Sequence, residues 1–558
     1  MFWNIKATQT EPENSEQFIA RFLQSRNLPF DPESIKAFTT PVNITLEYLL
    51  KETGIDKVEL TKAVTLINES IKSNRPIIIY GDYDVDGVCA TATLWQSLHN
   101  FGADVLPFIP RRLDHGYGLS EAGISDALKL HSTEIKPLII TVDNGITANK
   151  VIDKYQKTGI DFIITDHHLP PTNLPKTQAL VHTTAVCGTT VAFILSFALT
   201  GSLPPLDLVA LATVCDQLPL LGINRQLVLQ GLPEIRSPRR IGLTALLDQA
   251  GITNYQEIDT YHLGFVIGPR INAAGRLGHA LDALRLLCTP NQSQAGRLSD
   301  ELGLLNQDRQ DLTQVGIKKA IDFLQDKDTL PSILLISSPD LHEGIIGLIA
   351  AKLSDRFHRP AIAISTATAI SKASARSIDG VDITSILQKF ADLFIDIGGH
   401  AGAAGFTLKT ENIALLETKL QTVEISADLL KKSYDIDLLL HPNQDLSVIN
   451  SALKVLSPFG PMFPTPIFAL TNLLVSTKKI VGAAKSHLQL VLITSVGKTA
   501  RAICFNQAEV YPSLDTAPLN IAFYLQENTY NGYTNLQLNV QNIQTKDDLS
   551  ETASADKK

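Results

Sequence analysis

The chain has 558 residues, of which 44% are hydrophobic and 19% charged. This length predicts about three to four domains, and the composition excludes a disordered or collagen-like chain. The net charge of −9 argues against a uniformly basic nucleic-acid-binding surface, although it leaves a local basic groove open.

Cysteine usage and the N-terminus indicate the compartment. The five cysteines lie far apart and form no CxxC pair, which excludes a disulfide framework and a thiolate zinc site. The first residues lack the basic and apolar regions of a signal peptide, and no apolar run is long enough to span a bilayer. We therefore expect a soluble, cytoplasmic protein with no membrane partner.

Residues 1–70 form the first expected segment, which is polar and helical. Over residues 71–222, short apolar strands alternate with helices. The strands read PIIIY, DVLPFIP, PLIITVD and DFIITD, followed by a weaker ALVH. Such alternation is typical of an α/β domain with a doubly wound, mostly parallel sheet.

The second half of the chain divides into three further regions. Residues 223–325 show no strand pattern and form a helical connector, in which apolar residues at helical spacing predict one long helix. These residues are Leu298, Leu302, Leu305, Leu312 and Val315. Residues 326–430 predict a second, smaller α/β domain. Residues 431–545 predict a small β-barrel or sandwich with a hairpin turn at Asn531-Gly532, and residues 546–558 a disordered tail.

Three alternating carboxylates, Asp82, Asp84 and Asp86, follow the first strand and precede Gly87. The simplest interpretation is a polar turn that caps the next helix. The pattern D-x-D-x-D-G also opens an EF-hand calcium loop. However, the twelfth position is Thr93 where a glutamate is needed, and a strand precedes the loop.

Two further strands end in residues of the same kind. Asp143 ends PLIITVD, and Asp166-His167-His168 ends DFIITD. Because the carboxyl ends of the strands in an α/β sheet converge on one crevice, we expect these side chains to lie together. Clustered carboxylates require a cation, and the mixed Asp/His set favours Mn²⁺ or Mg²⁺. Asp216, after the helix LVALATVC, is one more candidate ligand.

The ordered motifs GDYDVDG, VDNG, TDHH and CDQLPL resemble those of the DHH phosphoesterase superfamily. In the second half, HEGIIGLIAAKL, SARS (374–377) and GGHAGAAGF (398–406) resemble the DHHA1 domain. With INAAGRLG (271–278) and the C-terminal barrel, the chain is similar over about residues 75–540 to the single-strand-specific DNA exonucleases of this superfamily.

The resemblance implies a metal-dependent exonuclease that degrades single-stranded DNA from the 5′ end to 5′-mononucleotides, in DNA repair and recombination. It implies two adjacent divalent ions, Mn²⁺ or Mg²⁺. The matching ligands are Asp82, Asp84, Asp86, Asp143, His167 and Asp216. Asp143 is expected to bridge the ions, and His168 to face the scissile phosphate. Tyr80 stands where many relatives have a metal-binding histidine, so we expect the first ion to be held more loosely or to depend on Asp82.

The resemblance also implies how DNA is held. Arg276, Ser374 and Arg376 match phosphate ligands, and His400 matches a residue that faces the active site from the second domain. Aromatic and basic residues in the barrel resemble an OB-fold, which stacks bases and follows the backbone, although a core role for each aromatic stays open. They are Phe505, Tyr524, Tyr530 and Tyr533, with Lys478, Lys479, Lys485 and Arg501. A helicase and a single-strand-binding protein are implied partners.

Two other functions stay open at this point. The same core serves in phosphodiesterases for short oligonucleotides or cyclic dinucleotides, which are usually shorter and lack the barrel. The superfamily also includes non-catalytic, DNA-binding scaffold members that have lost their metal ligands. The chain length argues against the first function, and the retained carboxylates and histidines argue against the second.

Overall fold

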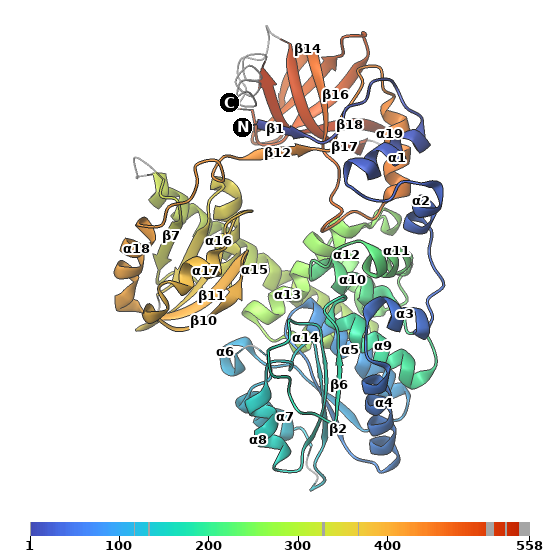
Figure 1. Ribbon diagram of the computed structural model, residues 1–558, viewed down its shortest axis with the longest axis vertical. Coiled ribbons are helices and arrows are strands. Elements are labelled where there is room, and N and C mark those ends of the chain that lie inside the picture. Colours follow the sequence, from blue (N-terminus) through green and yellow to red (C-terminus); the bar gives the residue numbers. More distant parts are fainter. Residues whose placement is uncertain are drawn as a thin grey trace. The chain divides into compact units, whose positions relative to one another are not determined.

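The structure is a computed structural model that describes residues 2–116, 118–131, 134–325, 330–366, 368–508, 518–530 and 533–545 (Figure 1). It divides into two compact units. One is Asn43–Leu430, and the other combines Met1–Val42 with Lys431–Lys558. The structural division near residue 42 therefore lies before the expected boundary at residue 70. None of the helices in the described ranges is long and apolar enough to cross a membrane.

The first sheet of unit Asn43–Leu430 has five strands in the order β3-β2-β4-β5-β6, and all four pairings are parallel. The strands are β2 (Ile77–Tyr80), β3 (Val105–Phe108), β4 (Leu138–Val142), β5 (Asp161–Asp166) and β6 (Ala179–His182). The residues of β2 and β4 are all buried because helices cover both faces. The predicted parallel, doubly wound sheet is confirmed.

Helices flank this sheet on both sides (Figure 1). They are α3 (Leu46–Thr53), α4 (Lys57–Lys72), α5 (Val85–Asn100), α6 (Arg112–His115), α7 (Glu121–Leu128), α8 (Asn149–Gln156) and α9 (Gly188–Thr200). Ile124 of α7 and Ile152 of α8 share a core with Ile78, Ile139 and Ile164 of the strands. Helices α4, α5 and α9 cover the opposite face.

A helical region follows, and it packs around α5. Its helices are α10 (Asp207–Cys215), α11 (Gly222–Arg236), α12 (Ile241–Gln249), α13 (Gly268–Leu277), α14 (Ala280–Cys288) and α15 (Gln292–Gln325), with a 3-10 turn at Tyr255–Glu257 and a π-helical turn at His262–Ile267. The long helix expected from the leucine spacing is α15. Its first leucines, Leu298 and Leu302, are buried, whereas Leu312 and Val315 are 40% and 55% exposed. Only the first half of the predicted apolar stripe therefore packs on neighbours.

The second sheet has the order β10-β11-β9-β8-β7, with one parallel pair and three antiparallel pairs. Its strands are β7 (Leu334–Ser338), β8 (Ala361–Ser365), β9 (Ile370–Arg376), β10 (Phe394–His400) and β11 (Ala403–Lys409). The helices of this domain are α16 (Ile346–Phe357), α17 (Ile383–Gln388) and α18 (Ile413–Gln421), with 3-10 turns at Ala391–Leu393 and Thr410–Asn412. The expected second α/β domain is confirmed.

The other unit contains a closed five-stranded barrel, in which β14 pairs with both β15 and β17. The barrel strands are β14 (Phe468–Val481), β15 (His487–Ile493), β16 (Thr499–Cys504), β17 (Leu519–Tyr530) and β18 (Tyr533–Thr545). The expected C-terminal barrel is confirmed. The predicted hairpin residues 531–532 and the predicted tail 546–558 lie outside the described residues.

The N-terminal residues complete this barrel unit. Strand β1 (Phe2–Ile5) pairs in parallel with β12 (Ser433–Ile436). The remaining elements of the unit are α1 (Ser15–Ser25), α2 (Pro32–Thr39), β13 (Leu438–Leu439) and α19 (Leu446–Leu456). Arg26 donates to both carboxylate oxygens of Asp437, and Phe18 lies against Phe468 with ring centroids 5.8 Å apart. The two ends of the chain therefore fold as one body.

Candidate active site

The candidate site lies where the strand order of the first sheet changes direction. Strand β3 flanks β2 on one side and β4 flanks it on the other. In open α/β sheets, ligands bind at such a point, beyond the carboxyl ends of the strands. The loop after β2 carries Asp82 and Asp84, Asp86 lies in the first turn of α5, and Asp143 directly follows β4. Acidic residues from the two loops therefore meet at one edge of the sheet.

The turn between β2 and α5 is tight. The Asp84 carboxylate accepts a hydrogen bond from the Gly87 amide at 3.0 Å and caps the helix. A Cβ atom on Gly87 would lie 2.6 Å from the backbone of Asp82, so the turn has no room for a side chain there. Asp82 is buried, and its Oδ2 atom has no hydrogen-bond partner among the described residues. A bound cation would satisfy this oxygen.

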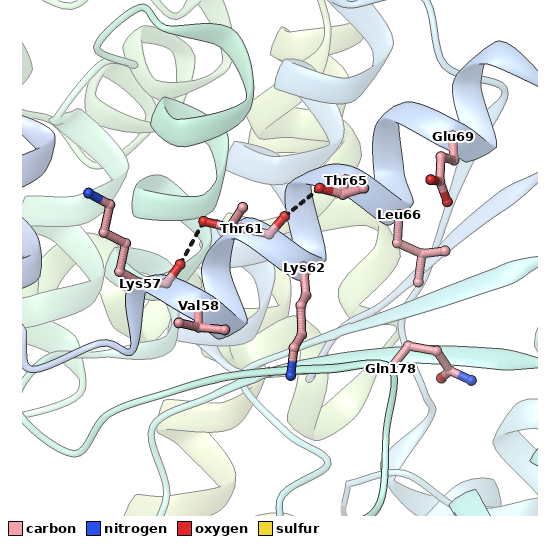
Figure 2. A pocket seen from close by; sticks show the side chains of 8 residues that line it. All are labelled: Lys57, Val58, Thr61, Lys62, Thr65, Leu66, Glu69 and Gln178. Carbon is pink, nitrogen blue, oxygen red and sulfur yellow. Dashed lines mark hydrogen bonds between the residues drawn. The ribbon is translucent and has the colours of Figure 1, made fainter.

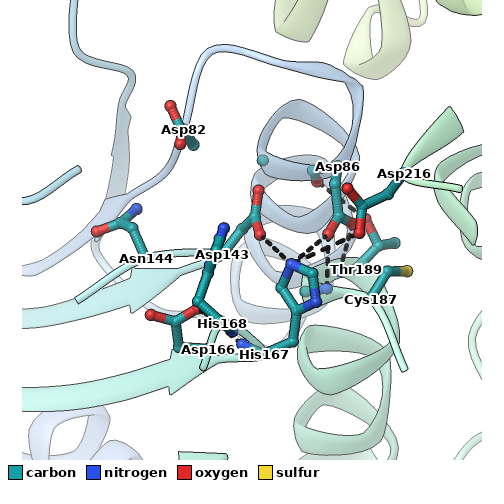
Figure 3. Close-up of polar contacts among 12 residues, drawn as sticks. Asp82, Asp86, Asp143, Asn144, Asp166, His167, His168, Cys187, Thr189 and Asp216 are labelled. Carbon is teal, nitrogen blue, oxygen red and sulfur yellow. Dashed lines mark hydrogen bonds and ion pairs between the residues drawn. The ribbon is translucent and has the colours of Figure 1, made fainter. Parts of the chain in front are cut away.

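Asp143 leaves its strand with a left-handed backbone, at φ 62°. This conformation costs a non-glycine residue about 1–3 kcal/mol and is concentrated at functional sites. The start of α9 comes close to it, because a Cβ atom on Gly188 would lie 2.6 Å from the Asp143 Cβ. In Figure 3 the Asp143 carboxylate points toward His167 instead of along the strand.

His167 lies beside carboxylates from three different segments of the chain (Figure 3). Its Nε2 atom lies 3.1 Å from Asp143 Oδ1 and 3.6 Å from both Asp86 Oδ2 and Asp216 Oδ2. The possible ligand atoms form two groups that share this histidine. One is Asp143, His167 and His168, the other is Asp86, His167 and Asp216, and within each group the atoms lie within 4.8 Å of one another.

Asp82 and Asp84 belong to neither of these groups, and Figure 3 shows Asp82 apart from the side chains around His167. Tyr80 is farther removed, on the sheet face that α7 covers. Its hydroxyl donates to the Gly118 carbonyl at 3.3 Å, and its ring packs against Phe108. Tyr80 therefore fills the core and offers no ligand.

The Asp86 carboxylate is fixed by the first residues of α9, which sequence analysis did not single out. The Gly188 and Thr189 amides donate to its two oxygens at 2.6 and 2.7 Å, and the Thr189 hydroxyl donates to the Asp86 carbonyl at 2.9 Å. The N-terminus of a helix stabilises negative charge. The signal in the sequence was the CGTT that opens a helix, and it is too common to have identified the contact.

Burial and mutual repulsion disfavour ionisation of the clustered carboxyl groups. Burial and the neighbouring Asp84 raise the pKa of Asp82 to about 8, and burial and Asp86 raise the pKa of Asp216 to about 8. Burial also raises the pKa of Asp143 well above its ordinary value. Divalent cations would reverse these shifts, and Mn²⁺ and Mg²⁺ suit the carboxylate and imidazole donors.

His168 is oriented by Asp166, which sequence analysis placed at the same sheet edge without giving it a role. Its Nδ1 atom lies 2.8 Å from Asp166 Oδ1, and Asp166 Oδ2 accepts from the Ile146 amide at 2.9 Å. Burial alone would lower the pKa of His168, but Asp166 and the other carboxylates raise it to about 9. Asp166 thus holds the ring in place, and the surrounding carboxylates favour its protonated form.

A second cluster, the arginine cluster, is made of Arg112, Arg276, Arg376 and Ser374. The Arg376 guanidinium donates to the Ser374 hydroxyl at 3.0 Å, and Arg276 donates to the Gly344 carbonyl at 3.1 Å. Within the described ranges, none of the three arginines forms an ion pair with a carboxylate.

Mutual repulsion and the close approach of a helix N-terminus make the arginine cluster a candidate anion site. Burial and the nearby Arg112 lower the pKa of Arg276 to about 10, and the same two causes lower the pKa of Arg376. A Cβ atom on Gly347, in the first turn of α16, would lie 3.2 Å from both the Arg376 Nη2 and the Ser374 Oγ. A helix N-terminus thus faces the arginines. Arg112 was missed because its loop has no recognisable phosphate motif.

The remaining predicted residues lie elsewhere. His400 is exposed on the edge strand β10, and its Nδ1 accepts from the Gly402 amide at 3.2 Å. In the barrel, Phe505 is exposed beside His487 and Tyr524 is half-buried, whereas the side chains of Tyr530 and Tyr533 lie outside the description. Of the four basic residues, Lys479, Lys485 and Arg501 are exposed and Lys478 is half-buried.

A groove of about 580 Å³ runs along the outer side of α4 (Figure 2). Side chains of α4, among them Val58 and Leu66, line it together with Gln178. The hydroxyls of Thr61 and Thr65 donate to backbone carbonyls of their own helix. No ligand cluster converges there among the described side chains, so the candidate site is the sheet edge.

Three segments match known domain families. Residues 76–213 match the DHH family, N-terminal domain, residues 330–424 match the DHHA1 domain, and residues 436–542 match the RecJ OB domain. The resemblance inferred from the motifs is confirmed.

Curated relatives match along most of the chain, and all three described here are named single-stranded-DNA-specific exonuclease RecJ. The Bacillus subtilis protein is 32% identical over 522 residues, which cover 86% of this chain and 65% of that protein. The Escherichia coli protein is 32% identical over 525 residues, which cover 86% of this chain and 89% of that protein. The Haemophilus influenzae protein is 32% identical over 555 residues, which cover 91% of this chain and 94% of that protein.

Solved structures agree. RecJ from Thermus thermophilus in complex with Mn²⁺ superposes with a TM-score of 0.79 at 27% identity, over 98% of this chain and 79% of that one. A structure of exonuclease RecJ bound to manganese gives a TM-score of 0.57 at 34% identity, over 65% of this chain and 93% of that one. The relatives that share this fold hold manganese at their own sites, which agrees with the donor set described above.

Proposed function

The chain belongs to the family of RecJ single-stranded-DNA-specific exonucleases, and we propose that it hydrolyses single-stranded DNA from the 5′ end to 5′-mononucleotides. The observation that carries the proposal is the presence of two oppositely charged clusters in one compact unit. Carboxylates and imidazoles gather at the sheet edge, and arginines gather at the start of α16. A phosphodiesterase acting from a phosphorylated end needs both.

Two divalent ions, Mn²⁺ or Mg²⁺, are the proposed cofactors. Asp86, Asp143, His167 and Asp216 would hold them, with Asp82 and Asp84 in support. Ions in such a site generate a hydroxide near neutral pH and neutralise the charge that develops on the phosphoryl oxygens. The amides of α9 fix the Asp86 carboxylate before any ion binds.

His168 is assigned to the scissile phosphate. Asp166 fixes the ring through Nδ1, so the imidazolium is oriented before the substrate arrives. A charged donor held in place strengthens as negative charge builds up on the phosphate oxygens. Asp166 therefore acts on the reaction through His168.

The terminal 5′ phosphate is assigned to Arg276, Ser374 and Arg376, with Arg112 added from the structure. Arginine offers a planar fork to phosphate oxygens, and the serine hydroxyl adds a donor. With the terminal phosphate held there, the next phosphodiester would reach the carboxylates, and each cut would release one nucleotide. In this assignment the arginine cluster would contact phosphate and no base edge, so we expect little sequence preference.

Further parts of the function rest on the family. We assign the barrel to additional single-stranded DNA and His400 to the active-site side of the second domain. We also propose a role in DNA repair and recombination, with a helicase and a single-strand-binding protein as partners, and a cytoplasmic location, which the five free cysteines support. Affinity purification with tagged chain would detect the partners.

The polarity assay tests the proposal. Purified protein and Mn²⁺ are incubated with single strands labelled at the 5′ or the 3′ end, beside a duplex and a dinucleotide. We expect labelled mononucleotide at the first time points only from the 5′-labelled strand. Mononucleotide released first from the 3′ end, or cleavage of the dinucleotide alone, would contradict it, and the second result would identify an oligonucleotide phosphodiesterase. Binding without cleavage would identify a scaffold.

A further inference from the structure

Two aromatic side chains are exposed together on the helical region of unit Asn43–Leu430. Tyr261 is 60% exposed and Phe265 is 69% exposed. Their rings are stacked, with centroids 5.2 Å apart and planes inclined by 23°. They are the only exposed residues between positions 258 and 277, all of which the structure describes. The pair is therefore an isolated exposed aromatic surface on a helix whose other residues are buried or half-buried.

The backbone that carries the pair is firmly anchored. The turn His262–Ile267 is wound as a π-helix, a geometry found frequently at functional sites. Its inward side chains, Leu263 and Ile267, are completely buried in the core of the helical region. The exposure of the rings thus does not come from a poorly packed segment.

The same turn touches the metal side of the candidate site. The Cys215 thiol donates to the Leu263 carbonyl at 3.4 Å, and Cys215 directly precedes the proposed ligand Asp216. A Cβ atom on Gly268 would lie 2.5 Å from the Cys215 sulfur, so helix and ligand segment meet without an intervening side chain.

The helix then continues past the acidic loop to the arginine cluster. Asn272 accepts a hydrogen bond from the Val85 amide at 3.1 Å, between the proposed ligands Asp84 and Asp86. A Cβ atom on Gly275 would lie 2.4 Å from the Tyr83 carbonyl, and Arg276 follows immediately. Along one helical run, the chain therefore places the aromatic pair, the Asp216 segment, the acidic loop and Arg276 in that order.

This order fixes a direction. From Phe265 to Arg276 the helical rise amounts to on the order of 15 Å. If Arg276 holds the terminal 5′ phosphate and the carboxylates hold the scissile phosphodiester, the aromatic pair lies on the 3′ side of the cut. This step rests on the polarity given under Proposed function.

We propose that Tyr261 and Phe265 form a stacking platform for unpaired bases on the 3′ side of the scissile phosphodiester. A pre-stacked pair offers a flat aromatic face to the next base, and every base has a π-face, so the contact is independent of sequence. Paired bases in a duplex are already stacked on both sides, so the platform also favours single strands.

A protein partner is less consistent with the same surface. Stable protein interfaces bury on the order of 800 Å² per partner, whereas the neighbours of the pair, such as Asp259, Thr260 and His262, are polar and half-buried. Two aromatic rings in a polar surround, next to a phosphodiester site, match the pattern of base stacking with backbone contacts.

The test measures binding in an Asp143→Ala background, which holds the substrate uncut. Fluorescence anisotropy is recorded with 5′-phosphorylated oligothymidylates from two to twelve nucleotides, in the presence of Mn²⁺. We expect Tyr261→Ala with Phe265→Ala to weaken binding of the longer strands by about 10- to 100-fold, in line with stacking energies per base, and to leave the dinucleotide unchanged. Tyr261→Phe with Phe265→Tyr should restore the parent affinity.

Phe101→Ala is the matched control, because Phe101 is an exposed aromatic (44%) at the opposite end of α5 from the acidic loop. It should bind strands of every length like the parent. Unchanged affinity of the double variant for long strands would overturn the proposal, and altered self-association in its place would assign the rings to protein docking. The outcome is separable from the polarity assay, since a length-dependent loss would support the platform even if wild-type protein cut no DNA.

Discussion

The carboxylates and histidines at the edge of the first sheet, here called the metal cluster, are opposite in charge to the arginine cluster. Both clusters bring groups of like charge close together. The metal cluster consists of Asp82, Asp84, Asp86, Asp143, His167, His168 and Asp216. The first collects carboxylates whose pKa values are raised by burial and by one another, and the second collects arginines whose pKa values are lowered for the same reasons. A folded chain ordinarily pairs such groups. Because each cluster collects like charges, we propose that both are binding sites, the first for cations and the second for phosphate.

The two clusters also differ in how they are built. Most of the carboxylates follow neighbouring strands of one sheet in short local motifs, and Asp216 follows α10. The arginines come from three places, since Arg112 begins α6, Arg276 lies in the last turn of α13 and Arg376 ends β9. The first cluster thus depends mainly on sheet topology, whereas the second depends on how the helical region and the second α/β domain pack.

Removing Asp143 should have the largest effect. Asp143 contacts His167, the residue that the two groups of possible ligands share. Asp143→Ala removes this carboxylate, so we expect nuclease activity to fall by at least about a thousand-fold. Folding should survive, because clustered negative charge is relieved. The measurement is mononucleotide release at saturating Mn²⁺ together with the circular dichroism spectrum. Asp153→Ala, an exposed carboxylate on α8, is the control, and wild-type activity of Asp143→Ala would contradict the assignment.

Removing the barrel unit should separate affinity from chemistry. A variant limited to residues 43–430 should still cleave short oligonucleotides, whereas its affinity for long single strands should fall by about 100-fold as stacking contacts are lost. Deleting only residues 431–558 should instead cause aggregation, because Phe18 and Phe22 lose the core that covers them. Long-strand binding equal to that of the whole chain would assign the barrel another role.

Changing the arginine cluster should alter end preference more than chemistry. Arg376→Ala should reduce the advantage of 5′-phosphorylated over 5′-hydroxyl strands by about 10- to 100-fold, the range for hydrogen bonds to charged groups. The check is competition between the two strands in a single reaction. Arg356→Ala, an exposed arginine on α16, should keep the full preference. If Arg376→Ala also kept the full preference for phosphorylated ends, the assignment of the terminal phosphate to the arginine cluster would be wrong.

Stability of the metal-free protein should decrease with rising pH. Folding raises the pKa of Asp82 and Asp216 from near 4 to about 8, so the folded state binds more protons in that interval. His168, with a pKa raised to about 9, loses its stabilising contribution as pH rises from about 6.5 to 9. Thermal unfolding should shift down by several degrees between pH 5 and pH 8. Mn²⁺ should reduce this shift, and a flat profile without metal would contradict the shifted pKa values.

The smallest effect is expected at Tyr80. Tyr80→Phe removes one hydrogen bond to the Gly118 carbonyl and should lower the free energy of unfolding by about 1 kcal/mol. The Mn²⁺ concentration for half-maximal activity should stay unchanged, because the ring lies on the sheet face away from His167. A raised metal requirement would show that Tyr80 supports the metal cluster after all.

The different construction of the regions explains what the sequence allowed us to predict. The sheet and its acidic edge were predictable because GDYDVDG, VDNG and TDHH are local motifs, and each directly follows a short apolar strand. Gly188 and Thr189 were not, since they approach Asp86 only after α9 packs beside α5. The union of β1 with β12 was not predictable either, because it joins residues more than 400 positions apart without a local motif.

The most direct test of the central claim is anomalous diffraction from crystals grown with Mn²⁺ and a non-hydrolysable 5′-phosphorylated dinucleotide. The account predicts two manganese peaks among Asp86, Asp143, His167 and Asp216, with the terminal phosphate bound by Arg276, Ser374 and Arg376. Manganese bound elsewhere, or a terminal phosphate away from the arginine cluster, would contradict it.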